Sequence, residues 1–180
     1  MSRSRSWHIL FTWLVILPGI GFLAGYFRFL DLDLGREFLI MIALGILAEW
    51  LGVSFPQGQL SGGFAVVLSS YLIYGPAPAS WISFLAALFG QGVVNRGNPF
   101  RTTLFNAAQY VLALTLASAV YARLQGRRGA DFGIADLAPL FAFLAVYFLA
   151  NHFLVYLYLL PGRRRYPLYA WADALRWDGL

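Results

Sequence analysis

The chain has 180 residues, of which 60% are hydrophobic and only 12% are charged, and its formal net charge is +5. A soluble domain carries about 25% charged residues, so this chain has too few charges to cover a water-facing surface. The composition therefore predicts a membrane protein, and it gives no sign of the basic soluble module that binds nucleic acid. Because cysteine is absent, disulfides, thiolate nucleophiles and zinc–cysteine sites are excluded.

Apolar runs separated by polar breaks predict an all-α, polytopic bundle of about six transmembrane helices over residues 1–165. The expected spans are residues 8–27, 38–53, 63–74, 81–94, 103–124 and 134–160. The breaks contain clustered Gly and Pro, as in FPQGQLSGG and GPAPAS, which interrupt helices. The third and fourth spans are shorter than the ~20 residues that cross a bilayer. We therefore expect them to tilt, to thin the bilayer locally or to form a re-entrant pair.

The first span follows the basic head MSRSRSWHIL and has no convincing small-x-small cleavage site, which predicts an uncleaved anchor. With the N-terminus inside, seven arginines would lie in the cytoplasm and five on the other side. The first set is Arg3, Arg5, Arg96, Arg101 and Arg163 to Arg165, and the second is Arg28, Arg36, Arg123, Arg127 and Arg128. By this small margin, the positive-inside rule favours a multi-pass membrane protein with both termini in the cytoplasm.

The last segment, residues 166–180, has an amphipathic pattern. Leu168, Trp171 and Leu175 recur at helical spacing with charged residues between them. This pattern is typical of a helix that lies at the membrane interface with its Trp rings at headgroup depth. We expect this segment to lead into a further domain.

Amides occur inside the predicted fourth and fifth spans. Asn106 and Gln109 share a helical face with Ala113 and Ala117, and Gln91 lies beside a stripe of small residues on the preceding span. Helices in lipid associate through small residues and interhelical amide hydrogen bonds, so one interpretation is a packed hairpin. The alternative is a polar cavity that binds a small-molecule ligand.

Glu49 lies late in the second span, in ILAEWLG. A carboxylate at membrane depth costs at least ~2.5 kcal/mol, so it usually faces a cavity or a partner. Near a helix end it can instead reach headgroups or water. If it is buried, we expect it to bind a ligand or to pair with Arg96 or Arg101, which belong to the same polar loop as Asn95.

Asn151 and His152 lie within the sixth span. A single His in an apolar helix is more often a satisfied hydrogen-bonding group than a metal ligand, so we expect no metal and no cofactor. The sequence contains no Walker loop, GxSxG or HExxH motif and no paired carboxylates in a plausible cleft. We therefore expect this chain to have no catalytic residues and no enzymatic activity of its own.

The first span carries Gly21 and Gly25, a small-xxx-small pair. Such a pair allows close approach of another helix, so it marks a possible packing or docking face.

The central region, from GQLSGGFAVVL to NPFRTTLFNAAQYVLA, has a recognisable pattern: a Gly-rich entry to a span, a GP break, and an N-P-R-LFNAAQ segment that opens the next span. The residues of this pattern are Gly62, Gly63, Gly75, Pro76, Asn98, Pro99, Arg101, Leu104, Phe105, Asn106, Ala107, Ala108 and Gln109. The pattern resembles the membrane-integral, MASE-like N-terminal sensor regions of bacterial cyclic-di-GMP signalling proteins. Those regions precede HD-GYP phosphodiesterase or diguanylate cyclase domains.

This resemblance implies a sensor or regulatory module of the bacterial inner membrane that relays a ligand or membrane state to a cytoplasmic output domain, and it implies dimerisation. The sequence contains no HD pair, GYP or GGDEF motif, so the resemblance covers the sensor without its catalytic domain. It supplies no ligand.

A second interpretation comes from another class of protein. The substrate-binding S-components of vitamin transporters are also small, six-span and basic on the cytoplasmic face, and they show a GP opening to a middle span. Against this interpretation, the first span has no clear Ala-xxx-Ala docking motif.

Overall fold

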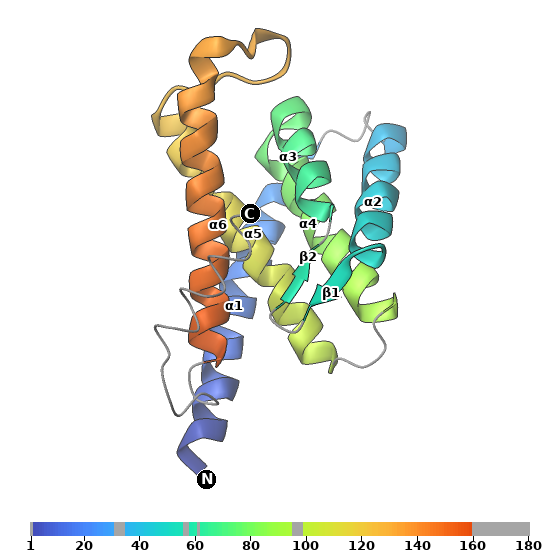
Figure 1. Ribbon diagram of the computed structural model, residues 1–180, viewed down its shortest axis with the longest axis vertical. Coiled ribbons are helices and arrows are strands. Elements are labelled where there is room, and N and C mark those ends of the chain that lie inside the picture. Colours follow the sequence, from blue (N-terminus) through green and yellow to red (C-terminus); the bar gives the residue numbers. More distant parts are fainter. Residues whose placement is uncertain (1, 31–34, 56–57, 61, 95–98, 160–180) are drawn as a thin grey trace.

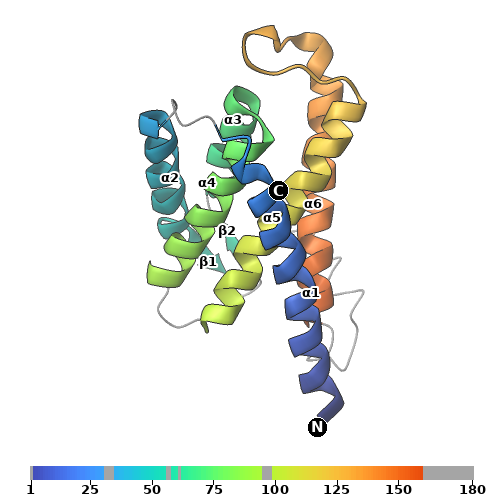
Figure 2. The same ribbon diagram turned by 180° about the vertical axis from the view of Figure 1, so that it is seen from behind.

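The computed structural model describes residues 2–30, 35–55, 58–60, 62–94 and 99–159. In this part of the chain, six α-helices form a bundle (Figure 1). They are α1 (Ser2–Phe27), α2 (Gly35–Trp50), α3 (Gly63–Tyr74), α4 (Pro76–Phe89), α5 (Phe100–Arg123) and α6 (Leu137–Leu159). The start of α1 and the end of α6 lie toward one end of the bundle, and the α5–α6 connection lies at the opposite end (Figures 1 and 2).

Helix α5 is the centre of the bundle, because all three hydrophobic clusters include its residues. It packs against α1 through Phe105 and Ala108, against α4 through Ala107 and Val111, and against α3 and α6 through a further group. That group includes Ala113, Leu114, Ala117 and Tyr121. The many buried alanines of α5 let its neighbours approach closely, as is usual between helices in membranes.

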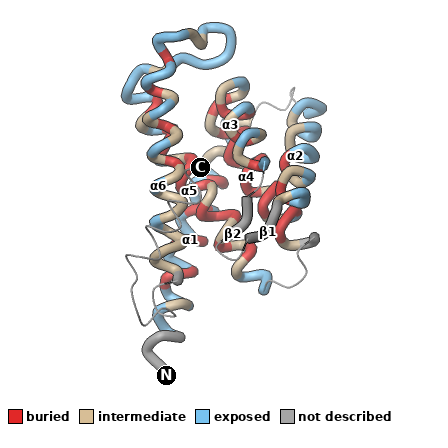
Figure 3. Tube along the Cα trace, in the orientation of Figure 1, coloured by how far each residue is buried: buried red, intermediate tan, exposed pale blue. Residues whose placement is uncertain are grey.

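The outer surface of the bundle is apolar. Figure 3 shows exposed positions along the outer sides of α1, α2 and α6. On α1, Leu10, Leu14 and Leu17 are each more than 60% exposed, and Phe141 on α6 is 66% exposed. Soluble proteins rarely expose such large contiguous apolar surfaces, so this surface fits a lipid environment.

Three of the described helical segments are long and apolar enough to cross a membrane: Ser6–Phe27, Phe100–Arg123 and Ile134–Tyr158. Helices α2, α3 and α4 have 16, 12 and 14 residues, fewer than the ~20 that a full crossing requires. The helical character that the sequence predicts is confirmed. A bundle of six full spans is not established by helix length.

The break between the third and fourth predicted spans contains fewer residues than expected. Gly75 alone separates α3 from α4, with φ 88° and ψ −173°, a conformation that only glycine adopts readily. Pro76 is then the first residue of α4, a position where proline is favoured because its missing N–H is not needed. The predicted start of the fourth span at residue 81, with GPAPAS as a break, was therefore wrong.

The connection between α2 and α3 also differs from the expected loop. Strands β1 (Val53–Phe55) and β2 (Gly58–Leu60) form an antiparallel hairpin in which Val53 pairs with Leu60. The second span was predicted to reach residue 53, but α2 ends at Trp50 and the chain becomes extended three residues later. Val and Phe favour extended structure, and this tendency outweighed the apolar character of the segment.

The α5–α6 connection folds back onto the α3–α4 turn. Arg127 and Asp136 form an ion pair of 3.1 Å, and the same carboxylate accepts hydrogen bonds from the backbone N–H groups of Arg127 and Gly133. The neighbouring guanidinium of Arg128 lies 5.6 Å from the centre of the Tyr71 ring on α3. These contacts tie the far ends of α3, α5 and α6 together.

Candidate functional site

A buried polar cluster lies where α2, α4 and α5 meet, toward the end of the bundle that holds the start of α1. It is built around a five-residue π-helix, η2 (Gly90–Val94), which continues α4. π-Helical turns are rare and occur frequently at functional sites. The turn places Gln91 beside the last residues of α2.

The close approach of α2 depends on Gly90. A Cβ atom at this position would lie 2.5 Å from the Cβ of Glu49 and 3.2 Å from the carbonyl oxygen of Ile46. No larger residue fits without moving one of the two helices. The absence of a side chain at residue 90 therefore brings Glu49 within reach of Gln91.

The side chains of Glu49, Gln91, Asn106 and Tyr110 form what we name the core amide network. Gln91 Nε2 donates to Glu49 Oε2 at 2.9 Å and to Tyr110 Oη at 3.4 Å, and Asn106 Nδ2 donates to Gln91 Oε1 at 3.0 Å. Gln91 thus uses both ends of its amide: the nitrogen donates to α2 and α5, and the oxygen accepts from α5. Glu49 and Gln91 are only 5% and 7% exposed, so the network lies inside the protein.

A second amide contact joins α5 to α6. Gln109 lies one turn beyond Asn106, and its Nε2 donates to the backbone carbonyl of Asn151 at 3.2 Å and also to the Asn151 side-chain oxygen. Gln109 is 1% exposed, and within the described residues its Oε1 atom has no hydrogen-bond partner. A buried amide oxygen without a partner is costly, so this position has unused capacity to accept a hydrogen bond.

His152 does not share this arrangement. Its Nδ1 lies 3.0 Å from the carbonyl oxygen of Phe148, one turn earlier on α6, and its ring packs against the Phe148 ring. This is the satisfied hydrogen-bonding role that the sequence favoured. Among the described residues, no three histidine or acidic side chains come together in a way that could hold a metal ion.

The structure brings together several of the candidate residues that the sequence predicted, and it leaves others apart. Glu49, Gln91 and Asn106 meet in the core amide network, while Gln109 and Asn151 meet at the α5–α6 contact. Arg101, proposed as a partner of Glu49, is exposed at the start of α5. Asn95, Arg96 and the segment 166–180 lie outside the described residues.

The packed-hairpin interpretation of the amides agrees with the Asn106–Gln91 hydrogen bond, which crosses from α5 to η2. Gln109, expected to act with Asn106, turns instead toward α6. The sequence analysis missed Tyr110. The available signal was its position four residues after Asn106, which places the two side chains on one face of a helix.

The small-xxx-small pair on α1, Gly21 and Gly25, lies on a side of the helix that does not contact the bundle. Cβ atoms placed on Gly21 or Gly25 would meet nothing within 4 Å, whereas one on Gly19 would lie 2.7 Å from the Cβ of Ala108. Gly19, rather than the small-xxx-small pair, therefore forms the close contact between α1 and α5.

An apolar outer surface, three helices of membrane-spanning length and a buried carboxylate–amide network define a helical membrane protein with a polar core. The family comparison agrees: residues 26–163 match the model of MASE9, and the chain belongs to this family of membrane-associated sensor domains. The matched region contains α2 to α6 and therefore the whole core amide network. No curated protein and no solved structure matches the chain.

Proposed function

We propose that this membrane-associated sensor domain detects a small molecule or a change in membrane state through the core amide network and relays it to a cytoplasmic output domain of cyclic-di-GMP signalling. The observation that carries the proposal is the set of buried hydrogen bonds that join α2, η2 and α5 through Gln91. Intramembrane ionisable residues such as Glu49 commonly mark functional sites.

The amide contacts give a continuous physical route out of the network. The route runs from Glu49 through Gln91 to Asn106 on α5, and one turn later from Gln109 to Asn151 on α6. Helix α6 ends at Leu159, and the chain continues beyond it. A rearrangement at Glu49 that repacks α5 would therefore change the position of the last helix before the C-terminal segment.

The mechanism is a shift between two packings of the bundle. Only a stimulus that binds the two packings with different affinity can move such an equilibrium. Interhelical amide bonds are worth about 0.6–2 kcal/mol each, so exchanging one or two of them is enough to change the ratio of two states by several-fold. In this proposal the chain carries out no chemical reaction itself and acts as a homodimer.

The transporter interpretation receives no support from the family to which the chain belongs. The sensor interpretation accounts for both the family and the buried network.

The proposal is tested by changing the network in the protein encoded at its native locus and measuring cellular cyclic-di-GMP by mass spectrometry. Glu49→Gln removes the charge but keeps an oxygen that can accept from Gln91, and Asn106→Leu removes the donor to Gln91. We expect each variant to change the cyclic-di-GMP level at least about twofold. Glu49→Gln replaces a charged hydrogen bond by a weaker neutral one, Asn106→Leu removes a bond, and a loss of ~0.6 kcal/mol changes an equilibrium by that order.

Ser69→Ala is the matched control, because Ser69 is an exposed polar residue of α3. It should leave the cyclic-di-GMP level unchanged. Membrane fractions must contain all three variants in wild-type amounts. If Glu49→Gln and Asn106→Leu meet this condition and still give the wild-type level, the network does not control this output.

A further inference from the structure

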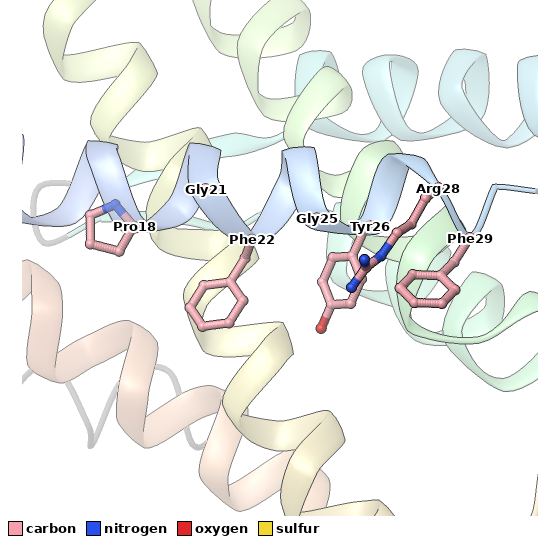
Figure 4. A pocket seen from close by; sticks show the side chains of 7 residues that line it. All are labelled: Pro18, Gly21, Phe22, Gly25, Tyr26, Arg28 and Phe29. Carbon is pink, nitrogen blue, oxygen red and sulfur yellow. The ribbon is translucent and has the colours of Figure 1, made fainter.

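A shallow groove of about 400 Å³ runs along the outer side of α1, outside the core amide network. Figure 4 shows the residues that line it: Pro18, Gly21, Phe22, Gly25, Tyr26, Arg28 and Phe29. The groove exists because Gly21 and Gly25 have no side chains, while Pro18, Phe22, Tyr26 and Phe29 form its apolar walls. One wall is fixed to the bundle, since Tyr26 Oη is 3.4 Å from Thr115 Oγ1 on α5.

The groove has the length of one leaflet of a bilayer. Residues 18 to 27, the helical part of the groove, cover about 14 Å at a rise of 1.5 Å per residue, and half of a ~30 Å hydrocarbon core is about 15 Å. The apolar span of α1 ends at Phe27. Arg28 therefore follows directly after the hydrocarbon-spanning part of the helix, where lipid headgroups begin.

Arg28 gives one end of the groove a positive charge. Its guanidinium carbon lies 4.9 Å from the centre of the Phe29 ring, which belongs to the same groove. Guanidinium groups bind phosphate through paired hydrogen bonds. An occupant that fits the whole groove must therefore be apolar over about 14 Å and anionic at one end.

We propose that this groove binds one phospholipid with a net negative headgroup, its acyl chain lying over Gly21 and Gly25 and its phosphate on Arg28. A second copy of the chain fits less well. A parallel, symmetric contact through the two glycines would bring the Arg28 residues of both copies close together, and like charges at such a contact are destabilising.

The test uses the purified chain in mild detergent, incubated with equal amounts of phosphatidylglycerol and phosphatidylcholine and analysed by native mass spectrometry. We expect one phosphatidylglycerol to remain per chain, with about fivefold preference over phosphatidylcholine, because one arginine near a headgroup contributes ~1 kcal/mol. Arg28→Gln should remove this preference. Arg36→Gln, an exposed arginine in the first turn of α2, should keep it.

Further substitutions test the apolar half of the site. Gly21→Leu combined with Gly25→Leu fills the groove, and we expect it to lower phosphatidylglycerol retention about fivefold or more, since most of the acyl-chain contact is lost. Ala24→Leu is the matched control, because Ala24 is an exposed residue of α1 that does not line the groove. Helix content measured by circular dichroism verifies folding.

Three results would overturn the proposal. The first is equal retention of the two lipids by the wild-type chain, and the second is equal loss in Arg28→Gln and Arg36→Gln. The third is a wild-type dimer that Gly25→Leu dissociates, because the groove would then be a contact between copies of the chain.

Discussion

At the scale of single residues, Gly90 controls whether the core amide network can form. The nearest atoms to a Cβ at this position belong to Glu49 and Ile46 on α2, and all are held by a helix that cannot yield without moving as a whole. We expect Gly90→Ala to push α2 away from η2 and to lower the free energy of unfolding by about 1–3 kcal/mol, the usual cost of overpacking. Unfolding by sodium dodecyl sulfate in mixed micelles measures this change.

Gly62→Ala is the control for Gly90→Ala. A Cβ at Gly62 would lie 3.7 Å from the Cβ of Ala48, also on α2, which is ordinary van der Waals contact. This variant should unfold within about 0.5 kcal/mol of wild type. If the two variants unfold alike, the distance between α2 and η2 does not depend on Gly90.

Some residues of the polar contacts could be predicted from the sequence, and others could not. Glu49, Gln91 and Asn106 could be selected from the sequence because charged and amide side chains are conspicuous in apolar helices. The pairing of Gln109 with Asn151 could not, because apolar residues occur on every side of α6 and do not reveal which side faces α5. The π-helical turn has no local signal, since it depends on the contact of Gly90 with another helix.

At the scale of elements, the α3–α4 turn and the α5–α6 connection form one structural unit. A Cβ at Gly75 would lie 2.6 Å from Nη1 of Arg128, so the arginine occupies the space beside the turn. Gly75 also has a backbone conformation that is essentially restricted to glycine. The end of the Arg128 side chain can shift, so it is the backbone conformation that requires glycine at residue 75.

We expect Gly75→Ala to lower the free energy of unfolding by about 1–3 kcal/mol, because it adds backbone strain and displaces Arg128. Thermal unfolding in detergent, followed by circular dichroism, measures the loss. Gly35→Ala is the control: Gly35 is the first residue of α2, and a Cβ there would meet nothing within 4 Å. An unfolding temperature of Gly75→Ala equal to that of Gly35→Ala would show that the turn carries no strain.

The sequence predicts the centres of the long helices better than it predicts where elements begin and end. The apolar centres of α1, α5 and α6 were located correctly because long runs without charge have no other explanation in a chain this apolar. The segment from residue 53 to residue 81 was misread at both ends. There, a short β-hairpin and a one-residue turn replaced the loops that clustered Gly and Pro predicted.

At the scale of the whole molecule, the direction of the helices constrains the number of crossings. Helices α1 and α5 both run from the end that holds the N-terminus toward the opposite end, and α6 returns (Figure 1). If α1 and α5 both cross the bilayer, α2, α3 and α4 must bring the chain back between them. The contact of Gly75 with Arg128 shows that the α3–α4 turn reaches the same end as the α5–α6 connection. On this condition, at least one of these short helices completes a crossing.

This arrangement is testable by labelling with a membrane-impermeant maleimide, because the chain contains no cysteine and each introduced thiol is unique. We expect Glu37→Cys, Tyr74→Cys and Ala130→Cys to react in intact cells, since all three lie at the end of the bundle opposite the N-terminus. Arg101→Cys, at the start of α5, should react only after the membrane is permeabilised. The positive-inside rule sets this orientation.

The pattern of labelling distinguishes the number of crossings from their orientation. If Glu37→Cys and Ala130→Cys react but Tyr74→Cys is protected both before and after permeabilisation, the α3–α4 turn is buried, and the pair is re-entrant. If Arg101→Cys reacts from outside and the other three do not, the number of crossings stands but the orientation is reversed. If Arg101→Cys and Ala130→Cys react from the same side, α5 does not cross, and a bundle centred on α5 cannot be the membrane-embedded form.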